Sequence, residues 1–143
     1  MPPLRIGDYI NAIVGPSKTL NEIDLNKGIM RRRIKKNQKK DTEDIIPLPK
    51  SLIKFIKERG ISGELFPDMS VTEIDNLLKK TYPGKKASPH YYRSYYTVHI
   101  LSKIKNKNKI IEALRVMDHS LEVNASYYNK QASSAYNNLL AGK

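Results

Sequence analysis

The sequence predicts a mainly helical α+β domain in which a small antiparallel three-stranded sheet packs beside a helical bundle. Short apolar runs separated by turn signals occupy the first third of the chain, and apolar residues at helical spacing occupy most of the remainder. With 143 residues and 39% hydrophobic content, the chain is long enough for one ordinary core. We therefore expect a single domain over residues 1–143, with a C-terminal tail from about residue 130.

Three β-strands are expected near the N-terminus. Asp8–Val14 is an apolar-rich run that ends at the turn signal Gly15-Pro16, which is typical of a strand. Lys27–Lys36 contains β-compatible side chains, and Asp44–Leu48 is a second short apolar run beyond a polar turn at Asn37–Asp41. The last two runs predict an antiparallel hairpin.

Two helices are expected after this hairpin. Lys50–Arg59 places apolar residues at helical spacing, and Gly60 is a typical helix stop. A second helix is expected to be capped by Ser70 or Thr72 and to end at Pro83-Gly84. The side chains of this second helix that are expected to face inward are Ile74, Leu77 and Leu78.

The second half of the chain is expected to be helical. Ser88-Pro89 begins a helix that runs to about Lys105, since proline is favoured in the first turn. The residues that lie mostly on one side of this helix are Tyr92, Tyr95, Tyr96, Ile100 and Leu101. The tyrosines expected to pack in the core are Tyr91, Tyr92, Tyr95 and Tyr96. Further helices are expected at Lys109–Met117, Leu121–Tyr128 and Ala132–Leu140.

The formal net charge of +12 makes a polyanion the favoured partner, because each phosphate that a cation neutralises releases condensed counterions. A nucleic acid is therefore the favoured partner. A membrane partner is not expected, because the chain has neither a long apolar run nor a basic amphipathic helix with large apolar anchors. The basic residues expected to contact DNA are Arg31, Arg32, Arg33, Lys35, Lys39, Lys40, Lys85 and Lys86.

Cysteine and histidine usage bears on cofactors and compartment. The absence of cysteine excludes disulfides and thiolate metal sites, and three widely separated histidines make a poor zinc site. No metal or other cofactor is expected. There is no signal-peptide pattern, and the compartment stays open, although reducing cytosol or nucleus fits.

A spaced set of chemically active residues stands in the second half of the chain, with His90 and Arg93 first, then His119, then Tyr128. Histidine can move a proton near neutral pH, arginine can hold two phosphate oxygens in a fixed fork, and tyrosine can act as a nucleophile. These are the parts needed to cut a phosphodiester without a metal. The set indicates a DNA-joining enzyme.

These residues lie in segments that resemble the tyrosine recombinases, also called phage-type integrases. Ser88–Arg93 is similar to the family's His-x-x-Arg box, and Met117–Glu122 is similar to its Leu-Gly-His-Ser segment, with Tyr128 at the usual place of the nucleophile. Asn21–Leu48 is similar to the strands that carry an active-site lysine. Pro2–Asp8 resembles the first arginine box of viral and virophage-like members. Four such boxes in the family's order cover nearly the whole chain.

The resemblance implies a covalent mechanism. Tyr128 would attack the scissile phosphorus and leave a 3′-phosphotyrosyl link, while Arg5 and Arg93 would neutralise the phosphate. Lys36 would protonate the leaving 5′-oxygen, with Lys39 as the alternative. Rejoining by a new 5′-hydroxyl reverses the step, so bond energy is kept and no ATP is implied.

Supporting roles follow from the same resemblance. His90 would orient the phosphate and assist proton transfer from the tyrosine, and His119 would donate a hydrogen bond to a phosphate oxygen. Asp8 would buttress Arg5 or His90. Tyr127 is the alternative nucleophile, and His99 is expected to be structural because it stands outside any motif.

The sequence departs from the family in three places. Asp118 stands where the family has glycine, and Ser94 replaces a common histidine. Arg5 is almost at the N-terminus, so the DNA-gripping domain that normally precedes the catalytic domain is expected to be missing. We expect such a fragment to be monomeric, and the full-length protein to form a homotetramer on DNA.

The tail has two expected modes of docking. Ala132–Leu140 offers a short apolar face, and it is expected to contribute little to the core of its own chain. The resemblance implies that the segment passes to a neighbouring protomer on DNA. Docking in cis is the alternative, and in the isolated fragment we expect the segment to be folded back or disordered.

Site-specific recombination or integration is thus the function that the sequence favours. A type IB DNA topoisomerase is the second enzymatic reading, although those enzymes generally carry lysine where this chain has His90. A basic DNA-binding protein that has lost catalysis is the alternative from a different class.

Overall fold

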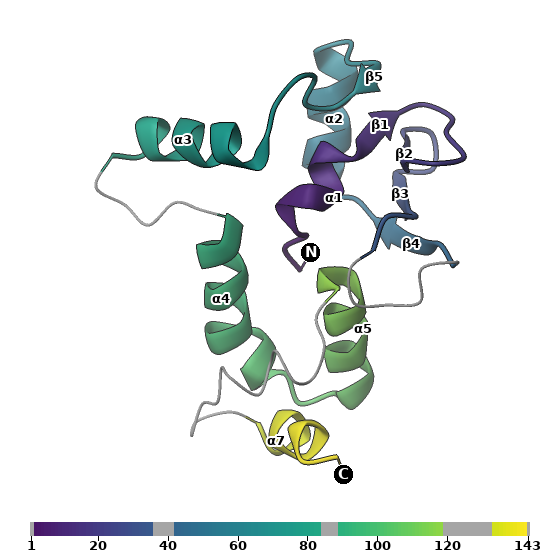
Figure 1. Cartoon of the computed structure of the whole chain (residues 1–143). Helices are drawn as coiled ribbons and strands as arrows, with labels where there is room; N and C mark the ends of the chain where they lie inside the picture. The colour runs from purple at the N-terminus through teal and green to yellow at the C-terminus, as the bar shows by residue number, and fades with distance from the viewer. Residues whose placement is uncertain (1, 36–41, 84–88, 119–132, 143) are drawn as a thin grey trace. The chain divides into compact units, whose positions relative to one another are not determined.

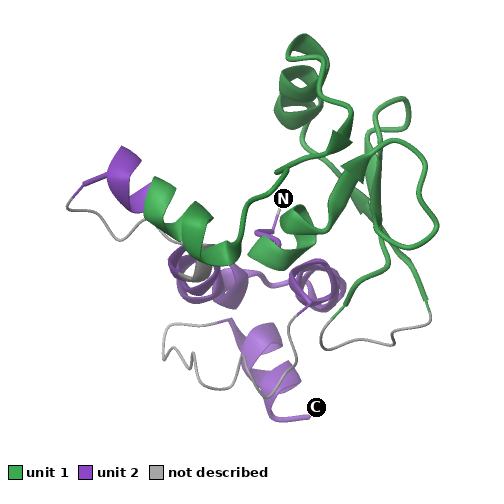
Figure 2. Ribbon diagram, turned by 45° about the horizontal axis from the view of Figure 1, so that its top comes forward, with its two compact units in different colours: residues 1, 6–77 green, residues 2–5, 78–143 purple. Residues whose placement is uncertain are grey.

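The computed structural model describes residues 2–35, 42–83, 89–118 and 133–142 (Figure 1). The chain divides into two compact units (Figure 2). Unit 1 is formed by Ile6–Leu77, and unit 2 is formed by Pro2–Arg5 together with Leu78–Lys143. Within the described residues, all strands lie in unit 1, and the regular elements that lie wholly in unit 2 are helices.

Within the described residues, unit 1 contains a five-stranded mixed sheet with the order β4-β3-β2-β1-β5. β1 pairs with β2 in parallel, and the other neighbours are antiparallel. The α+β class is therefore confirmed, but the expected three-stranded antiparallel sheet is wrong. The strands are β1 (Ala12–Val14), β2 (Asn21–Asp24), β3 (Ile29–Arg32), β4 (Asp44–Pro47) and β5 (Gly63–Glu64).

The short strands explain this error. The strands outside the three expected runs are β2 and β5, and β5 has only two residues, which is too short to display a period-two pattern. The expected strand over Asp8–Val14 is instead a short helix, α1 (Ile6–Ile10), followed by β1. The helix is closed by Asn11, whose main-chain N–H and side-chain Nδ2 both donate to the carbonyl oxygen of Gly7.

The predicted hairpin is confirmed as β3 and β4. Met30 lies opposite Ile46, and both side chains are completely buried. A tight turn also joins β2 to β3, where the Asp24 side chain accepts a hydrogen bond from the main-chain N–H of Lys27 and Gly28 has a φ of 65°. Glycine adopts this left-handed conformation without the steric cost that a Cβ brings.

Two predicted helices follow the sheet. α2 (Lys50–Glu58) ends before Gly60, as expected, and buries Ile56. α3 (Val71–Thr81) begins with a capping box, in which Ser70 accepts from the main-chain N–H of Glu73 and donates to its carboxylate. Ser70 is therefore the cap. The expected inward position of Leu77 is wrong, because this side chain is 53% exposed.

The described helices of unit 2 are α4 (Pro89–His99), the 3₁₀ turn η1 (Leu101–Lys103), α5 (Lys107–Met117) and α7 (Ser134–Leu140). The expected helix to Lys105 thus ends early, since Ile100 leaves the helical conformation. A hydrophobic cluster joins η1, α5 and α7. Its buried members are Leu101, Ile110, Ala113, Leu114, Met117 and Tyr136.

α7 docks in cis on this cluster. Tyr136 is 1% exposed, and Ser133 caps the helix by accepting from the main-chain N–H of Tyr136. The Ser133 N–H and hydroxyl also donate to the carbonyl oxygens of Ser102 and Ile104. The expectation that the tail adds little to its own core is therefore wrong, because a large aromatic side chain in the core anchors it.

Three of the four tyrosines of α4 are placed differently from the expectation, whereas Tyr96 packs against the hydrophobic cluster of unit 2, as expected. The buried side of the helix carries Arg93 and Thr97, and Thr97 donates back to the carbonyl oxygen of Arg93. Tyr91, Tyr92 and Tyr95 are between 39% and 49% exposed, and Tyr95 stacks near His99 with ring centroids 4.5 Å apart. A helix with aromatics on several sides has no single apolar face, so its spacing could not show which side would be buried.

Candidate active site

Arg93 projects from the buried side of α4 and is held by two main-chain carbonyl groups. Nη1 donates to the oxygen of Pro3 at 3.1 Å, and Nη2 donates to the oxygen of Met117 at 2.7 Å. The residue is 8% exposed. Two hydrogen bonds in different directions fix the plane of the guanidinium group. Because carbonyl oxygens carry no formal charge, these two bonds orient the cation without neutralising it.

Arg5 is held at the same helix end by a carboxylate. Nη2 of Arg5 lies 3.1 Å from Oδ2 of Asp118, the residue that caps the C-terminus of α5. The side chain of Asp118 is completely buried, whereas that of Arg5 is 22% exposed. Part of the Arg5 side chain is therefore reached by solvent, although its Nε atom is buried, and the carboxylate partner is not reached.

Asp118 occupies the position at which the resembled family has glycine. Its φ of 53° and ψ of 42° are left-handed, and its main-chain N–H donates to the carbonyl oxygens of Leu114 and Arg115. Helices commonly end in a residue of this conformation, which glycine adopts most easily and which aspartate tolerates. The departure from the family therefore leaves the helix end in a conformation that glycine also allows.

Two predicted catalytic residues are thus brought together by the structure. Arg5 and Arg93 are far apart in the sequence, yet both attach to the last turn of α5 and its cap. His119 follows Asp118 directly in the sequence. The backbone of His90 lies in the first turn of α4, three residues before Arg93.

Several predicted site residues lie outside the described residues, and their predictions stay untested. Those expected to be catalytic are Lys36, His119 and Tyr128, with the alternatives Lys39 and Tyr127. Those expected to bind DNA are Lys39, Lys40, Lys85 and Lys86. The expected helix over Leu121–Tyr128 also lies there.

The other tyrosines of unit 2 differ in their suitability as nucleophiles. Burial raises the pKa of Tyr136 above its ordinary value of 10.0, and the same is true of Tyr96. Tyr136 is also packed in the hydrophobic cluster. A buried phenol that resists ionisation is a poor nucleophile, so Tyr136 does not replace Tyr128 as the candidate.

Unit 1 contains a buried ionic cluster that the sequence did not indicate. Arg32 is 0% exposed and lies between two carboxylates, with Nη1 3.4 Å from Asp8 and Nη2 2.9 Å from Asp44. The Lys35 side chain is also buried, donates to the Thr42 hydroxyl at 2.8 Å and lies 3.8 Å from Asp44. Arg32 and Lys35 are therefore buried and paired with carboxylates in this structure, and their predicted DNA contacts stay a prediction.

Asp8 belongs to this cluster rather than standing free on the surface. Its side chain is 0% exposed, and its shown partner is Arg32 of the same unit. Its carbonyl oxygen also accepts from Nδ2 of Asn21, which is another buried polar group. The predicted role of Asp8 beside Arg5 or His90 stays a prediction.

Arg31 and Arg33 lie on the partly exposed side of the same strand region. Each guanidinium group lies within 3.8 Å of Glu22 and within 3.6 Å of Glu43, and the side chains are 23% and 24% exposed. A phosphate could reach them only in competition with two carboxylates. Their predicted DNA contact stays a prediction, and part of their charge is already balanced.

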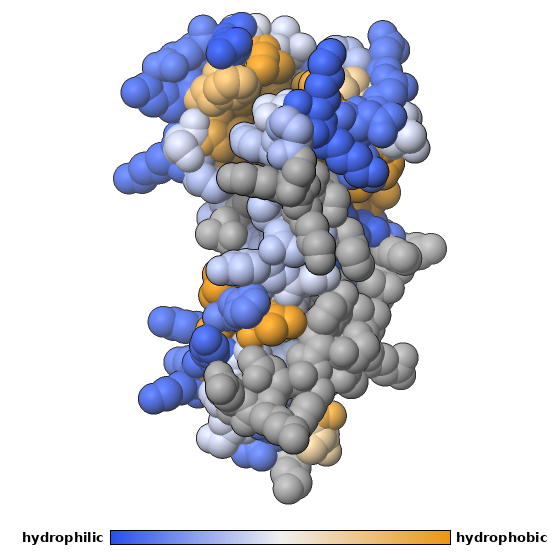
Figure 3. Space-filling view, turned by 90° about the vertical axis from the view of Figure 1, so that its left-hand side faces the viewer, coloured by the Kyte–Doolittle hydropathy of each residue, from blue (hydrophilic) through white to orange (hydrophobic). Residues whose placement is uncertain are grey.

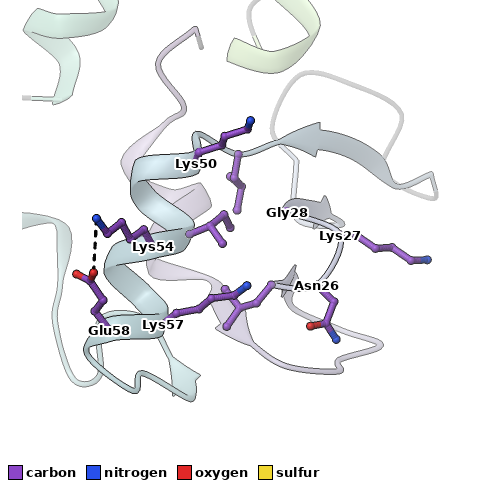
Figure 4. A pocket seen from close by; sticks show the side chains of 10 residues that line it. Asn26, Lys27, Gly28, Lys50, Lys54, Lys57 and Glu58 are labelled. Atoms are coloured by element: carbon purple, nitrogen blue, oxygen red, sulfur yellow. Dashed lines mark ion pairs between the residues drawn. The ribbon is translucent and has the colours of Figure 1, made fainter.

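A pocket of about 490 Å³ lies in unit 1 between α2 and the β2–β3 turn (Figure 4). None of the predicted site residues lines it. Lys57 reaches from α2 towards the turn that holds Asn26, whereas Lys54 forms an ion pair with Glu58 on the other side of the helix. Its apolar lining is formed by Leu25, Leu48 and Ile53.

The described surface is rich in hydrophilic side chains. On the face drawn in Figure 3, these side chains are spread widely, and hydrophobic ones form only small groups between them. No helix among the described residues is long and apolar enough to cross a membrane. In the same residues, no group of three or more histidine, cysteine, aspartate or glutamate side chains is arranged to hold a metal ion.

Comparisons with known proteins returned no match to a family model, to a curated protein or to a solved structure. The site is therefore interpreted from its own residues.

Sequence reasoning missed one feature of this site and one feature of unit 1. Asp118 was read only as a departure from glycine, although an acid directly before a predicted catalytic histidine could have suggested a partner for an arginine. The exposed lysines around the pocket of unit 1 were also missed. They are spread over Lys27, Lys50 and Lys57, which no sequence pattern connects.

Proposed function

We propose that this chain is the catalytic domain of a site-specific DNA recombinase of the tyrosine recombinase type. It would cleave and rejoin double-stranded DNA through a 3′-phosphotyrosyl intermediate. The observation that carries the proposal is the attachment of Arg5 and Arg93 to one helix end, just before His119 in the sequence. The assignment of the α+β architecture to this family's catalytic domain is part of the same proposal.

The chemistry of phosphoryl transfer explains why two ordered arginines support it. A phosphodiester gains negative charge on its non-bridging oxygens as a fifth ligand approaches the phosphorus. Cations that are already oriented stabilise this charge without reorganisation, and arginine presents a planar fork that matches two oxygens. Arg93 is oriented by two carbonyl groups and Arg5 by a carboxylate, so both cations are fixed before any DNA binds.

The proposed reaction balances without a cofactor. The Tyr128 oxygen bonds to phosphorus, its proton passes towards His90, and the bond from phosphorus to the 5′-oxygen breaks. Lys36 supplies the proton that the departing 5′-oxygen needs, and His119 donates a hydrogen bond to a phosphate oxygen. Attack by a second 5′-hydroxyl reverses these transfers and releases Tyr128.

The charge of the chain supports DNA as the substrate. A net charge of +12 favours a polyanion, and contacts to phosphates supply affinity that does not depend on the base sequence. Among the described residues that were predicted to bind DNA, Arg31 and Arg33 have partly exposed side chains. Target choice would need base contacts in addition.

Covalent trapping tests the proposal. The protein would be incubated with a pool of nicked duplexes whose sequence is randomised around the nick, so that the short cleaved fragment diffuses away. We expect a protein–DNA adduct that survives detergent and is destroyed by protease. Tyr128→Phe should abolish the adduct with little change in DNA affinity, because only the nucleophilic oxygen is lost. Tyr127→Phe is the matched control and should retain it.

Other outcomes have clear meanings. Loss of the adduct in Tyr127→Phe alone would move the nucleophile by one residue. Relaxation of supercoiled DNA without site preference would favour a topoisomerase. Tight DNA binding with no adduct on any member of the pool would contradict the proposal and favour a binding protein without catalysis.

A further inference from the structure

We infer that Asp118 is a positioning residue that holds the Arg5 guanidinium group in the orientation required to bind a phosphate together with Arg93. The inference rests on the proposed function, but it concerns a residue to which the resemblance assigns no role. In the resembled family the corresponding position is glycine, which has no side chain to hold a cation.

The burial of the two partners decides which one a phosphate meets. The Asp118 side chain is 0% exposed, whereas that of Arg5 is 22% exposed, and the two groups are 3.1 Å apart. An anion that approaches from solvent can therefore contact the exposed part of the Arg5 side chain, but not the fully buried carboxylate. The carboxylate thus lies where it can orient the cation, in the way that outer carboxylates orient the ligands of metal sites.

The backbone of Asp118 is also held in place, because this residue caps the C-terminus of α5. Asp118 caps α5 with its N–H bonded to the oxygens of Leu114 and Arg115, at a φ of 53°. Such a conformation disfavours residues with a Cβ, so aspartate is more strained at this position than glycine would be. The adjacent carbonyl of Met117 binds Arg93. One helix end therefore orients both guanidinium groups.

Electrostatics and positioning predict opposite effects of removing this carboxylate. A negative charge near an anion site repels the anion, so its removal should strengthen phosphate binding if the charge alone matters. If the carboxylate orients Arg5, its removal lets the guanidinium group rotate away and weakens phosphate binding. The sign of the change separates the two accounts.

The test uses the full chain and inorganic phosphate as the probe, titrated at constant ionic strength. Arginine side-chain N–H resonances in NMR spectra report both binding and rotation about the Nε–Cζ bond. We expect Asp118→Asn and Asp118→Gly to weaken phosphate binding by about tenfold, as loss of an outer partner typically does in metal sites. The Arg5 guanidinium group should rotate slowly in the native protein and faster in both variants.

Asp68→Gly is the matched control. Asp68 is an exposed aspartate whose φ of 58° is close to the 53° of Asp118. Its replacement removes one negative charge and one left-handed Cβ, and it should leave phosphate binding and Arg5 rotation unchanged. If Asp118→Asn fails to fold, Asp118→Gly carries the test, because glycine suits this conformation.

Arg5→Gln and Arg93→Gln separate this inference from the proposed function. Each should remove most of the phosphate binding. If they do, and the Asp118 variants bind phosphate equally well or more tightly, the positioning role is overturned while the site stands. If neither arginine variant changes phosphate binding, or the native chain binds none, the phosphate site is overturned and the role of Asp118 with it.

Discussion

Arg32 of β3 and Asp44 of β4 are direct cross-strand partners, and Nη2 of Arg32 lies 2.9 Å from Oδ2 of Asp44. With Asp8 on the other side of the guanidinium group, the pair forms a buried ionic cluster inside unit 1. These charged groups therefore pair with one another in the folded state and are not available to a ligand.

We predict that Arg32→Ala destabilises the protein strongly. The substitution leaves the Asp8 and Asp44 carboxylates buried beside an apolar side chain, and such losses typically cost about 3–5 kcal/mol. Urea unfolding would measure the change. Arg31→Ala is the control on the same strand, and its partly exposed ion pairs should be worth no more than about 1 kcal/mol. Equal losses at both positions would contradict a structural role for Arg32.

Arg31→Ala and Arg32→Ala should also differ in their effects on DNA binding. Arg31→Ala should lower DNA affinity and reduce its salt dependence by roughly one counterion. An Arg32→Ala protein that remains folded should keep the native salt dependence. Binding measured at several salt concentrations would show whether Arg32 contacts DNA after all.

We predict that Arg93→Lys slows covalent adduct formation by roughly 10²-fold, as removal of one oriented donor typically does. Lysine keeps the charge, but it cannot reach the oxygens of Pro3 and Met117 with a rigid fork. Arg115→Lys is the matched control, because Arg115 pairs with the exposed Glu112 at the surface of α5. Single-turnover rates would check this, and similar rates for both variants would show that charge alone suffices.

We predict that Tyr136→Ala lowers the free energy of unfolding by about 3–5 kcal/mol, as truncation of a large buried aromatic side chain does. Tyr136 lies in the hydrophobic cluster of unit 2 and anchors α7. Tyr95→Ala removes an exposed tyrosine from α4 and should change stability much less. Thermal or urea unfolding would measure both. A small effect at Tyr136 would show that α7 is not part of the core and would favour its exchange between protomers.

We predict that stability falls at alkaline pH, in part through Tyr136. Burial raises the pKa of Tyr136 above 10.0, so the folded state keeps its proton where the unfolded state loses it. This contribution is complete below the unfolded pKa and is lost as pH rises through the folded pKa. Burial and then the charge of Asp8 also raise the pKa of Tyr9, which contributes in the same direction.

Urea unfolding at about pH 9 and about pH 11 would measure this dependence, since tyrosine ionises near pH 10. Tyr136→Phe should show a smaller fall in stability over this interval than the native protein. An identical fall in both would assign the alkaline loss to other groups.

Local patterns in the sequence sufficed to predict α2, α3 and the hairpin of β3 and β4. Ser70 and Glu73 form the capping box that starts α3, and Gly60 follows the end of α2, because these signals act within a few residues. The hairpin of β3 and β4 was equally local. β5 and the parallel pairing of β1 escaped prediction, because two or three residues carry no periodic signal and a parallel neighbour is decided by distant pairing.

The site divides in the same way. The order and spacing of His90, Arg93, His119 and Tyr128 are properties of the sequence, as is the net charge of +12, and together they determined the proposed chemistry. Only the tertiary structure decided which cations remain available. Arg32 is buried between Asp8 and Asp44, and Arg5 pairs with Asp118. Both arrangements depend on residues that are remote in sequence. A charged side chain reads the same in a sequence whether it faces water or a buried carboxylate.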